Sequence, residues 1–179
     1  MRYLEEHPAV GLVYSAATVI DEAGVTIRFR PAADPHDLYE RNPVGWCFMY
    51  PAWVRTEIGG YDPAFFLAED IEYWLRISMR YVVAAIPDDL YLYRAHAGSL
   101  TESRKLDCRR AYAMVQLRHI AKLPWASREE KARVLYELMS FFLTEARRTL
   151  GLRACLQGAI QSPRYFFRRF REKQRLARG

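Results

Sequence analysis

The stretch GGYDPAFFLAEDIEYWLRISMRYVVAAIPDDLYLYRAHAGSLT, residues 59–101, decides the expected fold of this chain. Within it, Ile71, Trp74 and Leu75 recur at the spacing of one helix face, which predicts a short amphipathic helix. The acidic pair Glu69-Asp70 stands at the start of that helix. The same stretch therefore predicts a helix that carries carboxylates at its entrance.

The second half of this stretch changes to a strand pattern. Residues 82–86 and 90–93 are apolar and β-rich, and the Pro-Asp-Asp segment at 87–89 predicts a turn between two strands. Arg94 and His96 follow the second strand. A carboxylate, a basic residue and an imidazole are the residue types of a group-transfer site.

The flanking sequence extends this α/β pattern and then becomes helical. Before residue 59, buried strands are expected at 10–15 (extended through 18–21) and at 46–50, a further strand at 25–27 and a short helix at 52–58. After residue 103, helices are expected at 105–120, from Ser127 to about Leu150, at 155–160 and from Pro163 onward. Ser127 with Glu130 forms a capping-box pattern, and Gly151 is expected to stop the second of these helices.

Length and cysteine content limit the class of protein. A chain of 179 residues is long enough for one domain with a core, and no apolar run approaches the roughly 18–20 residues needed to span a bilayer. The first residues lack the apolar segment of a secretory signal. Three widely spaced cysteines suggest neither a disulfide framework nor a zinc site. We therefore expect a cytoplasmic protein, peripheral at most on the inner face of the membrane.

The formal net charge of +6 conceals an asymmetry along the chain. Residues 1–103 contain 8 Lys and Arg against 15 Asp and Glu, whereas residues 104–179 contain 19 against 6. Two regions of opposite charge are expected to have different surroundings or partners. We therefore divide the chain into residues 1–103 and a basic helical region, 104–179.

The residues alone give Asp70 two interpretations. A carboxylate in the first turn of a helix is favoured by the helix dipole and is expected to stay ionised at neutral pH. Placed near an acceptor hydroxyl, it can take up the proton as that oxygen attacks, as a general base does. The alternative is that Asp70 only caps the helix. Glu69 points in another direction on the helix, so the two carboxylates are not expected to share a proton.

Four motifs in order resemble one family of enzymes. The motifs are NPVGWCFMY at 42–50, GGYDP at 59–63, AEDIEYWLR at 68–76 and YRAHAGSLT at 93–101. Together with the opening HPAVGLVYS and IDEAG segments, they are similar to the acceptor half of a family 2 glycosyltransferase over residues 4–103. That family contains inverting enzymes of GT-A fold and hexosyltransferase type, which move a sugar from a nucleotide donor to an acceptor hydroxyl, often in polysaccharide or glycolipid assembly.

The resemblance implies a role for each motif residue. Asp70 corresponds to the catalytic base, and Glu69 beside it to a structural or acceptor-contacting residue. Trp74 would wall the acceptor pocket with an aromatic face, with simple burial in the core as the alternative. Tyr61 and Asp62 form the acceptor-side loop before the base, where Asp62 could be only a turn residue.

Arg94 and His96 fall where the family places groups near the donor diphosphate and its metal. Arginine offers a fixed fork to phosphate oxygens, and a neutral imidazole suits a divalent ion, so His96 is a tentative metal ligand. The complete family enzyme is expected to use Mg²⁺ or Mn²⁺, and none is expected for this chain alone.

One part of the family pattern is missing. The sequence contains no Asp-x-Asp motif, which in the family holds the metal on the donor diphosphate, and no glycine-rich phosphate loop. We therefore expect an α/β, partial GT-A domain lacking its nucleotide-binding half: a fragment, a split subunit that needs an N-terminal partner, or a mis-started reading frame. Whether it acts as an enzyme stays open, because a non-catalytic remnant or binding module with the acceptor pocket is the alternative. In a complete enzyme the partners would be a nucleotide sugar and a glycan or lipid-linked acceptor.

The C-terminal segment 164–178 interleaves aromatic residues with arginines. One interpretation is a helix on an anionic membrane surface. A solvated helix that packs its phenylalanines on the body is the plain alternative. Nucleic-acid binding is not expected, because no recognisable nucleic-acid motif accompanies the basic residues.

Overall fold

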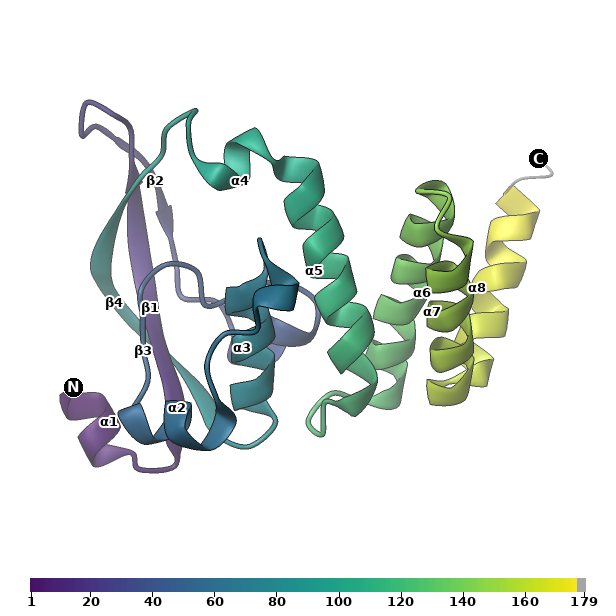
Figure 1. Cartoon of the computed structure of the whole chain (residues 1–179), viewed down its shortest axis with the longest axis horizontal. Coiled ribbons are helices and arrows are strands. Elements are labelled where there is room, and N and C mark those ends of the chain that lie inside the picture. Colours follow the sequence, from purple (N-terminus) through teal and green to yellow (C-terminus); the bar gives the residue numbers. More distant parts are fainter. Residues whose placement is uncertain (177–179) are drawn as a thin grey trace. The chain divides into compact units, whose positions relative to one another are not determined.

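The structure is a computed structural model that describes residues 1–176. In these residues the protein is mixed α/β, with one four-stranded mixed sheet and eight α-helices (Figure 1). The chain divides into two compact units, Met1–Val115 and Gln116–Gly179. The division falls inside one helix, so the functional boundary expected after residue 103 stays a prediction.

The first unit contains the sheet. Its elements are α1 (Arg2–Glu6), β1 (Val10–Ile20), β2 (Thr26–Arg30), β3 (Phe48–Met49), α2 (Ala52–Ile58), α3 (Glu69–Ser78), β4 (Val82–Arg94), α4 (Leu100–Ser103) and the first part of α5 (Lys105–His119), with 3-10 turns at Pro35–Tyr39 and Pro63–Phe65. β1 is buried along nearly its whole length, because its eleven residues are almost all apolar. It pairs parallel with β4 and antiparallel with β2 and β3.

Helix α3 covers one face of this sheet, where it packs against β1 and β4 (Figure 1). The predicted apolar stripe forms the contact, since Ile71, Trp74 and Leu75 are all buried. This packing places the first turn of α3, with Glu69 and Asp70, at a fixed position beside the sheet. The predicted helix is confirmed.

Two strand predictions are wrong. The segment from Val82 to Arg94 is one strand, not two strands with a turn. The pairing with β1 passes from Ser15–Ile86 to Ala16–Asp89, so the two residues between, Pro87 and Asp88, form a bulge and the strand continues after it. Proline has no N–H to donate to a neighbouring strand, and a bulge is a position where none is needed. The expected buried strand at 46–50 is only the two-residue β3, and both of its side chains are exposed.

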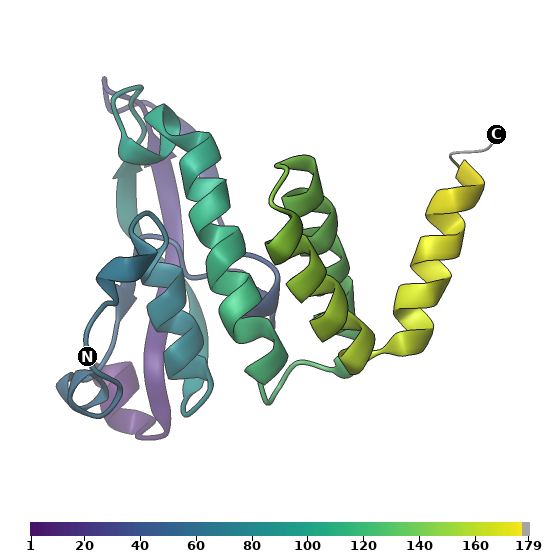
Figure 2. The same cartoon turned by 45° about the vertical axis from the view of Figure 1, so that its right-hand side comes forward.

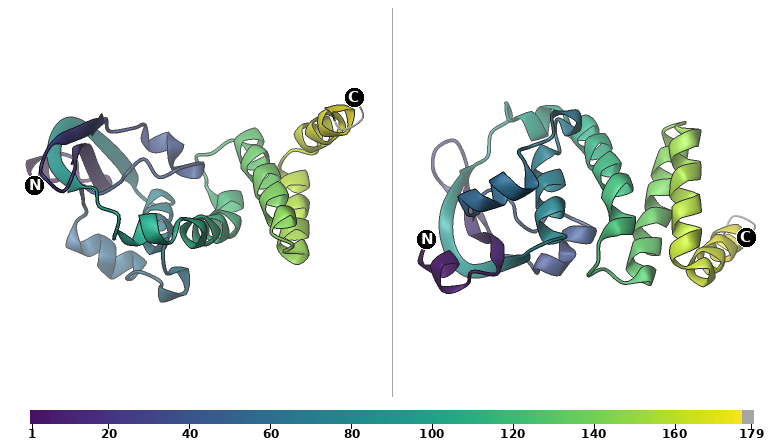
Figure 3. Two further views of the ribbon diagram at one scale, coloured as in Figure 1. Left: turned by 90° about the horizontal axis from the view of Figure 1, so that it is seen from above. Right: turned by 60° about the horizontal axis from the view of Figure 1, so that its bottom comes forward.

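The second unit is helical. It contains the end of α5, a 3-10 turn at Ile120–Lys122, α6 (Arg128–Thr144), α7 (Arg148–Gln161) and α8 (Pro163–Leu176). α6 and α7 lie side by side as a hairpin (Figure 3), and α8 leaves the end of α7 and contacts both helices near its start (Figure 2). The predicted capping box of Ser127 and Glu130 is confirmed.

The prediction that one helix runs to Leu150 and is stopped by Gly151 is wrong. α6 ends at Thr144, and Gly151 lies inside α7. A Cβ at Gly151 would stand 3.0 Å from the Leu143 side chain. The glycine therefore allows close approach within the helical hairpin instead of ending a helix.

Candidate functional site

Asp70 lies in the first turn of α3 and is partly buried. Its Oδ1 accepts a hydrogen bond from the backbone N–H of Ile71 at 2.7 Å. Its Oδ2 faces the side-chain amide of Asn42 at 3.5 Å, which is a long, weak contact. The carboxylate is thus held in place by two donors, from α3 itself and from the loop before β3.

The loop that carries Asn42 is itself fixed from three sides. The Asn42 Oδ1 accepts the Gly45 N–H at 3.2 Å, and this bond turns the Nδ2 toward Asp70. Arg30 donates to the carbonyls of Asn42 and Pro43 at 2.9 and 3.2 Å and lies over the Trp46 ring at 5.1 Å. Gly45 has φ +71°, in the left-handed region that favours glycine, and a Cβ there would stand 1.7 Å from Arg30 Nη1, so a larger residue would displace the Arg30 guanidinium.

The backbone just before α3 is strained. Leu67 has φ +75°, in the left-handed region that a bulky residue rarely adopts. Such a conformation costs on the order of 1–3 kcal/mol and persists only where the surroundings enforce it. It stands three residues before Asp70 and sets the direction in which the chain enters α3.

Burial controls the electrostatics of Asp70. Desolvation raises the pKa of this carboxyl above its ordinary value, and the neighbouring charge of Glu69 raises it further, against the lowering effect of the Ile71 N–H and the Asn42 amide. Desolvation therefore outweighs the N-terminal donors on which the sequence-based expectation rested, whereas the expected ionisation at neutral pH stays a prediction. A carboxylate with a raised pKa is a stronger base.

Glu69 precedes Asp70 in the first turn of α3. Its Oε2 is buried and has no hydrogen-bond partner within residues 1–176. An acceptor that is buried without a donor costs free energy.

Tyr112 on α5 is a residue near Asp70 that the sequence did not single out. Burial raises the pKa of its hydroxyl, and the negative charges of Glu40 and Asp70 raise it further. The hydroxyl is buried and has no hydrogen-bond partner in the described part of the chain. No motif marks it, because α5 lies about forty residues further along the chain and outside the four motifs.

Trp74, four residues after Asp70 on α3, is fully buried in an aromatic cluster. Its ring makes edge contacts with Phe48 and Tyr61, with centroids 4.4 and 6.4 Å apart, and packs beside Tyr50 and Tyr73. A side chain with no exposed surface offers no face to a sugar in this structure. The position of Trp74 therefore agrees with the alternative interpretation, simple burial in the core.

Tyr61 presents the exposed aromatic surface of this cluster. It is 46% exposed and contacts Tyr73 edge-on at 4.9 Å. Partial burial, with Tyr50 close by, raises the pKa of Tyr61 to about 12, so its hydroxyl stays a hydrogen-bond donor at neutral pH. The loop carrying it is tied to α3 by Arg76, which donates to the carbonyls of Ile58 and Gly60 at 2.8 and 2.7 Å.

Asp62 has a local structural contact. Its side chain accepts the Ala64 N–H at 2.9 Å and caps the 3-10 turn Pro63–Phe65. This is the turn role that was the alternative to acceptor binding.

Arg94 is the last residue of β4, and His96 follows it by two residues. Arg94 Nη1 donates to the carbonyls of Asp21 and Glu22 at 2.9 and 2.7 Å, and so holds the turn between β1 and β2. His96 is exposed and lines a hollow of about 490 Å³ with Tyr93, Trp46 and Arg28 among its other walls. Trp46 and Tyr93 stack there at 3.8 Å.

Asp70 and Arg94 therefore have different hydrogen-bond partners. Asp70 makes no hydrogen bond or ion pair with Arg94 or His96; its hydrogen bonds go to Ile71 and Asn42. Within residues 1–176, no group of three or more His, Cys, Asp or Glu side chains could hold a metal ion. The described residues do not by themselves fit a divalent metal at His96, and its metal role stays a prediction.

The same residues contain no helix long and apolar enough to cross a bilayer. A scan of the sequence against models of protein families found no match, and a search of curated proteins found no significant match.

Proposed function

We propose that this chain carries the acceptor side of a sugar-transfer site of GT-A type, family 2, in which Asp70 is the catalytic base. Asp70 takes the proton of an acceptor hydroxyl while that oxygen forms a bond to the anomeric carbon of a nucleotide sugar. The bond from that carbon to the diphosphate breaks, the nucleotide diphosphate leaves, and the configuration is inverted. The donor and its binding groups come from outside the described residues.

One observation carries the proposal: a half-buried carboxylate at the entrance of α3, held by Ile71 and Asn42 and preceded by strained backbone at Leu67. Burying a carboxylate costs stability unless it is fully paired, and here the pKa is raised, so its partners do not offset the burial. Charged groups kept in unfavourable surroundings cluster at functional sites. The exposed face of Tyr61 offers a sugar an aromatic surface near the base.

The test is transfer measured in extracts of the cells that make the protein, prepared after deletion of its gene and supplied with radiolabelled UDP- and GDP-sugars and with added purified chain. We expect label to enter a glycan or lipid-linked acceptor with the wild-type chain. With Asp70→Asn we expect the transfer rate to be at least about a hundredfold lower, because a general base usually contributes that much to the rate. Asp88→Asn is the matched control, because Asp88 is exposed on β4. Equal transfer by Asp70→Asn and wild type would contradict the proposal.

A non-catalytic sugar-binding module is the second candidate. Two observations favour it: Arg94 donates to the β1–β2 turn, and Asp70 makes no hydrogen bond or ion pair with Arg94 or His96. Saturation-transfer NMR with simple saccharides distinguishes the two. Saccharide binding that is unchanged in Asp70→Asn, with no transfer in any extract, would favour the module.

A further inference from the structure

One side of helix α8 is fixed to the helical hairpin. Phe166 is 6% exposed and meets the Tyr136 ring of α6 edge-on, with centroids 5.4 Å apart. Gly158 on α7 makes room for it, since a Cβ there would stand 2.0 Å from the Phe166 ring. Arg168 reaches Glu129 at 3.2 Å. The buried Phe166 ring, and not the exposed Arg168–Glu129 pair, marks the side of α8 that packs on the hairpin.

Two further aromatic rings of α8 are exposed to solvent. Phe167 is 66% exposed and Phe170 is 52% exposed. Residues three or four apart are neighbours on a helix surface, so Phe170 lies beside Phe167 and also beside the buried Phe166. Leaving both in water is unfavourable, because each ring carries a large apolar surface. The plain alternative, in which all the phenylalanines pack on the body, therefore holds for Phe166 only.

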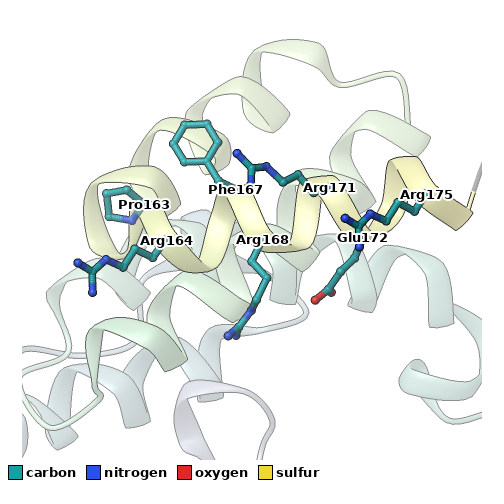
Figure 4. A pocket seen from close by; sticks show the side chains of 7 residues that line it. All are labelled: Pro163, Arg164, Phe167, Arg168, Arg171, Glu172 and Arg175. Carbon is teal, nitrogen blue, oxygen red and sulfur yellow. The ribbon is translucent and has the colours of Figure 1, made fainter.

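Arginines flank these rings. Figure 4 shows Phe167 and Arg171 projecting from one side of α8, and Arg168 and Glu172 from the opposite side. A shallow hollow of about 490 Å³ runs along the helix between Pro163 and Arg175, lined mainly by arginine side chains. α8 carries six Arg or Lys residues and a single acid, Glu172. Arg164 and Arg171 make no hydrogen bond or ion pair with the described residues.

We propose that α8 docks on an anionic lipid surface. Phe167 and Phe170 reach the boundary between headgroups and acyl chains, and Arg164 and Arg171 bind lipid phosphates. An amphipathic helix with aromatics on one face and flanking arginines has this property, because apolar burial and electrostatic attraction add. The expected segment ran to residue 178; residues 177 and 178 lie outside the described residues.

Charge complementarity favours an anionic lipid surface, and not a second copy of the chain, as the partner of α8. A two-fold contact through the same face of α8 would bring the flanking arginines of both copies together, and like charges repel. A bilayer of anionic lipid supplies the opposite charge and an apolar layer at the same time. The proposal does not depend on sugar transfer, and Asp70→Asn is expected to bind lipid as the wild type does.

The experiment is co-sedimentation of the full chain with vesicles of phosphatidylcholine, with or without one quarter phosphatidylglycerol, at 0.1 and 0.5 M NaCl. We expect binding to the anionic vesicles that falls at high salt. Arg164→Gln with Arg171→Gln should weaken it about thirtyfold, at about one kcal/mol per arginine. Phe167→Ser with Phe170→Ser should weaken it about tenfold, because half-exposed rings gain only part of their full burial.

Matched controls use the first unit. Arg2→Gln with Arg55→Gln removes the same charge from exposed positions, and Phe29→Ser removes an exposed ring of β2. Circular dichroism checks that each variant is folded. Equal binding to neutral and anionic vesicles, no binding, or equal loss in the controls would overturn the proposal. So would tighter binding to a DNA duplex, or an α8-dependent dimer that does not bind vesicles.

Discussion

The surroundings of Asp70 and of Arg94 differ sharply, although the sequence motifs place both residues in one predicted site. Asp70 is half-buried, lies four residues before the buried Trp74 on α3, and has a raised pKa. Arg94 is exposed and donates two hydrogen bonds to the turn between β1 and β2. The contrast shows that Asp70 is kept at a cost in folding stability, whereas Arg94 adds to the stability of the fold. Removing each group should therefore change stability in opposite directions.

The largest effect should come from the packing around Trp74. Trp74 is fully buried against Phe48, Tyr50, Tyr61 and Tyr73. Trp74→Ala should therefore lower the free energy of unfolding by about 3–5 kcal/mol, the usual cost of truncating a buried aromatic residue. Urea unfolding followed by circular dichroism measures this loss.

Trp53→Ala is the matched control, because Trp53 is 38% exposed and should cost about 1 kcal/mol. Trp74→Phe keeps most of the buried ring and should cost less than Trp74→Ala, which covers the case in which the alanine variant does not fold. Equal losses from Trp74→Ala and Trp53→Ala would show that the region around Trp74 is not a packed core.

The second effect has the opposite sign. Burial raises the folded-state pKa of Asp70 above its value in the unfolded chain. Between these two pKa values the folded protein binds more protons than the unfolded chain, so stability falls as pH rises through that window. Asp70→Asn cannot ionise and should be more stable than the wild type at pH 7, by about 0.5–2 kcal/mol, the usual size of such gains.

At pH 3 the difference should shrink toward zero, because the wild-type carboxyl is then protonated in both states. Urea unfolding at pH 3, 5 and 7 checks the sign, with Asp88→Asn within about 0.5 kcal/mol of the wild type throughout. A less stable Asp70→Asn at pH 7 would mean that its hydrogen bonds outweigh the burial.

The elements that sequence periodicity predicts are those that depend on local pattern. The apolar stripe of α3 and the capping box of α6 are confirmed, since both are set within a few residues of chain. The continuation of β4 through Pro87 and the place of Gly151 inside α7 could not be predicted. Both depend on a neighbouring strand or helix distant in sequence.

The candidate site follows the same rule. Asp70 at a helix entrance is visible in the sequence, whereas its burial and the nearby Tyr112 depend on how α5 packs in the first unit. The engagement of Arg94 could not be seen either, because its partners lie over seventy residues earlier in the chain.

The smallest effect should come from Arg94. Arg94→Gln removes two charged hydrogen bonds to the carbonyls of Asp21 and Glu22, and since the site is exposed we expect a loss of about 0.5–1.5 kcal/mol. Faster amide hydrogen exchange at Gly24 and Val25, whose N–H groups bond to Asp21, should accompany the loss. Arg55→Gln is the control, because Arg55 is exposed on α2 away from this turn. If Arg94 instead served only to bind a phosphate, Arg94→Gln would leave amide exchange in the turn unchanged. The free energy of unfolding would then stay the same or rise, as expected for Asp70→Asn. That outcome would support Arg94 as a phosphate-binding residue of the same site as Asp70, and the two residues would then no longer differ in their effect on stability.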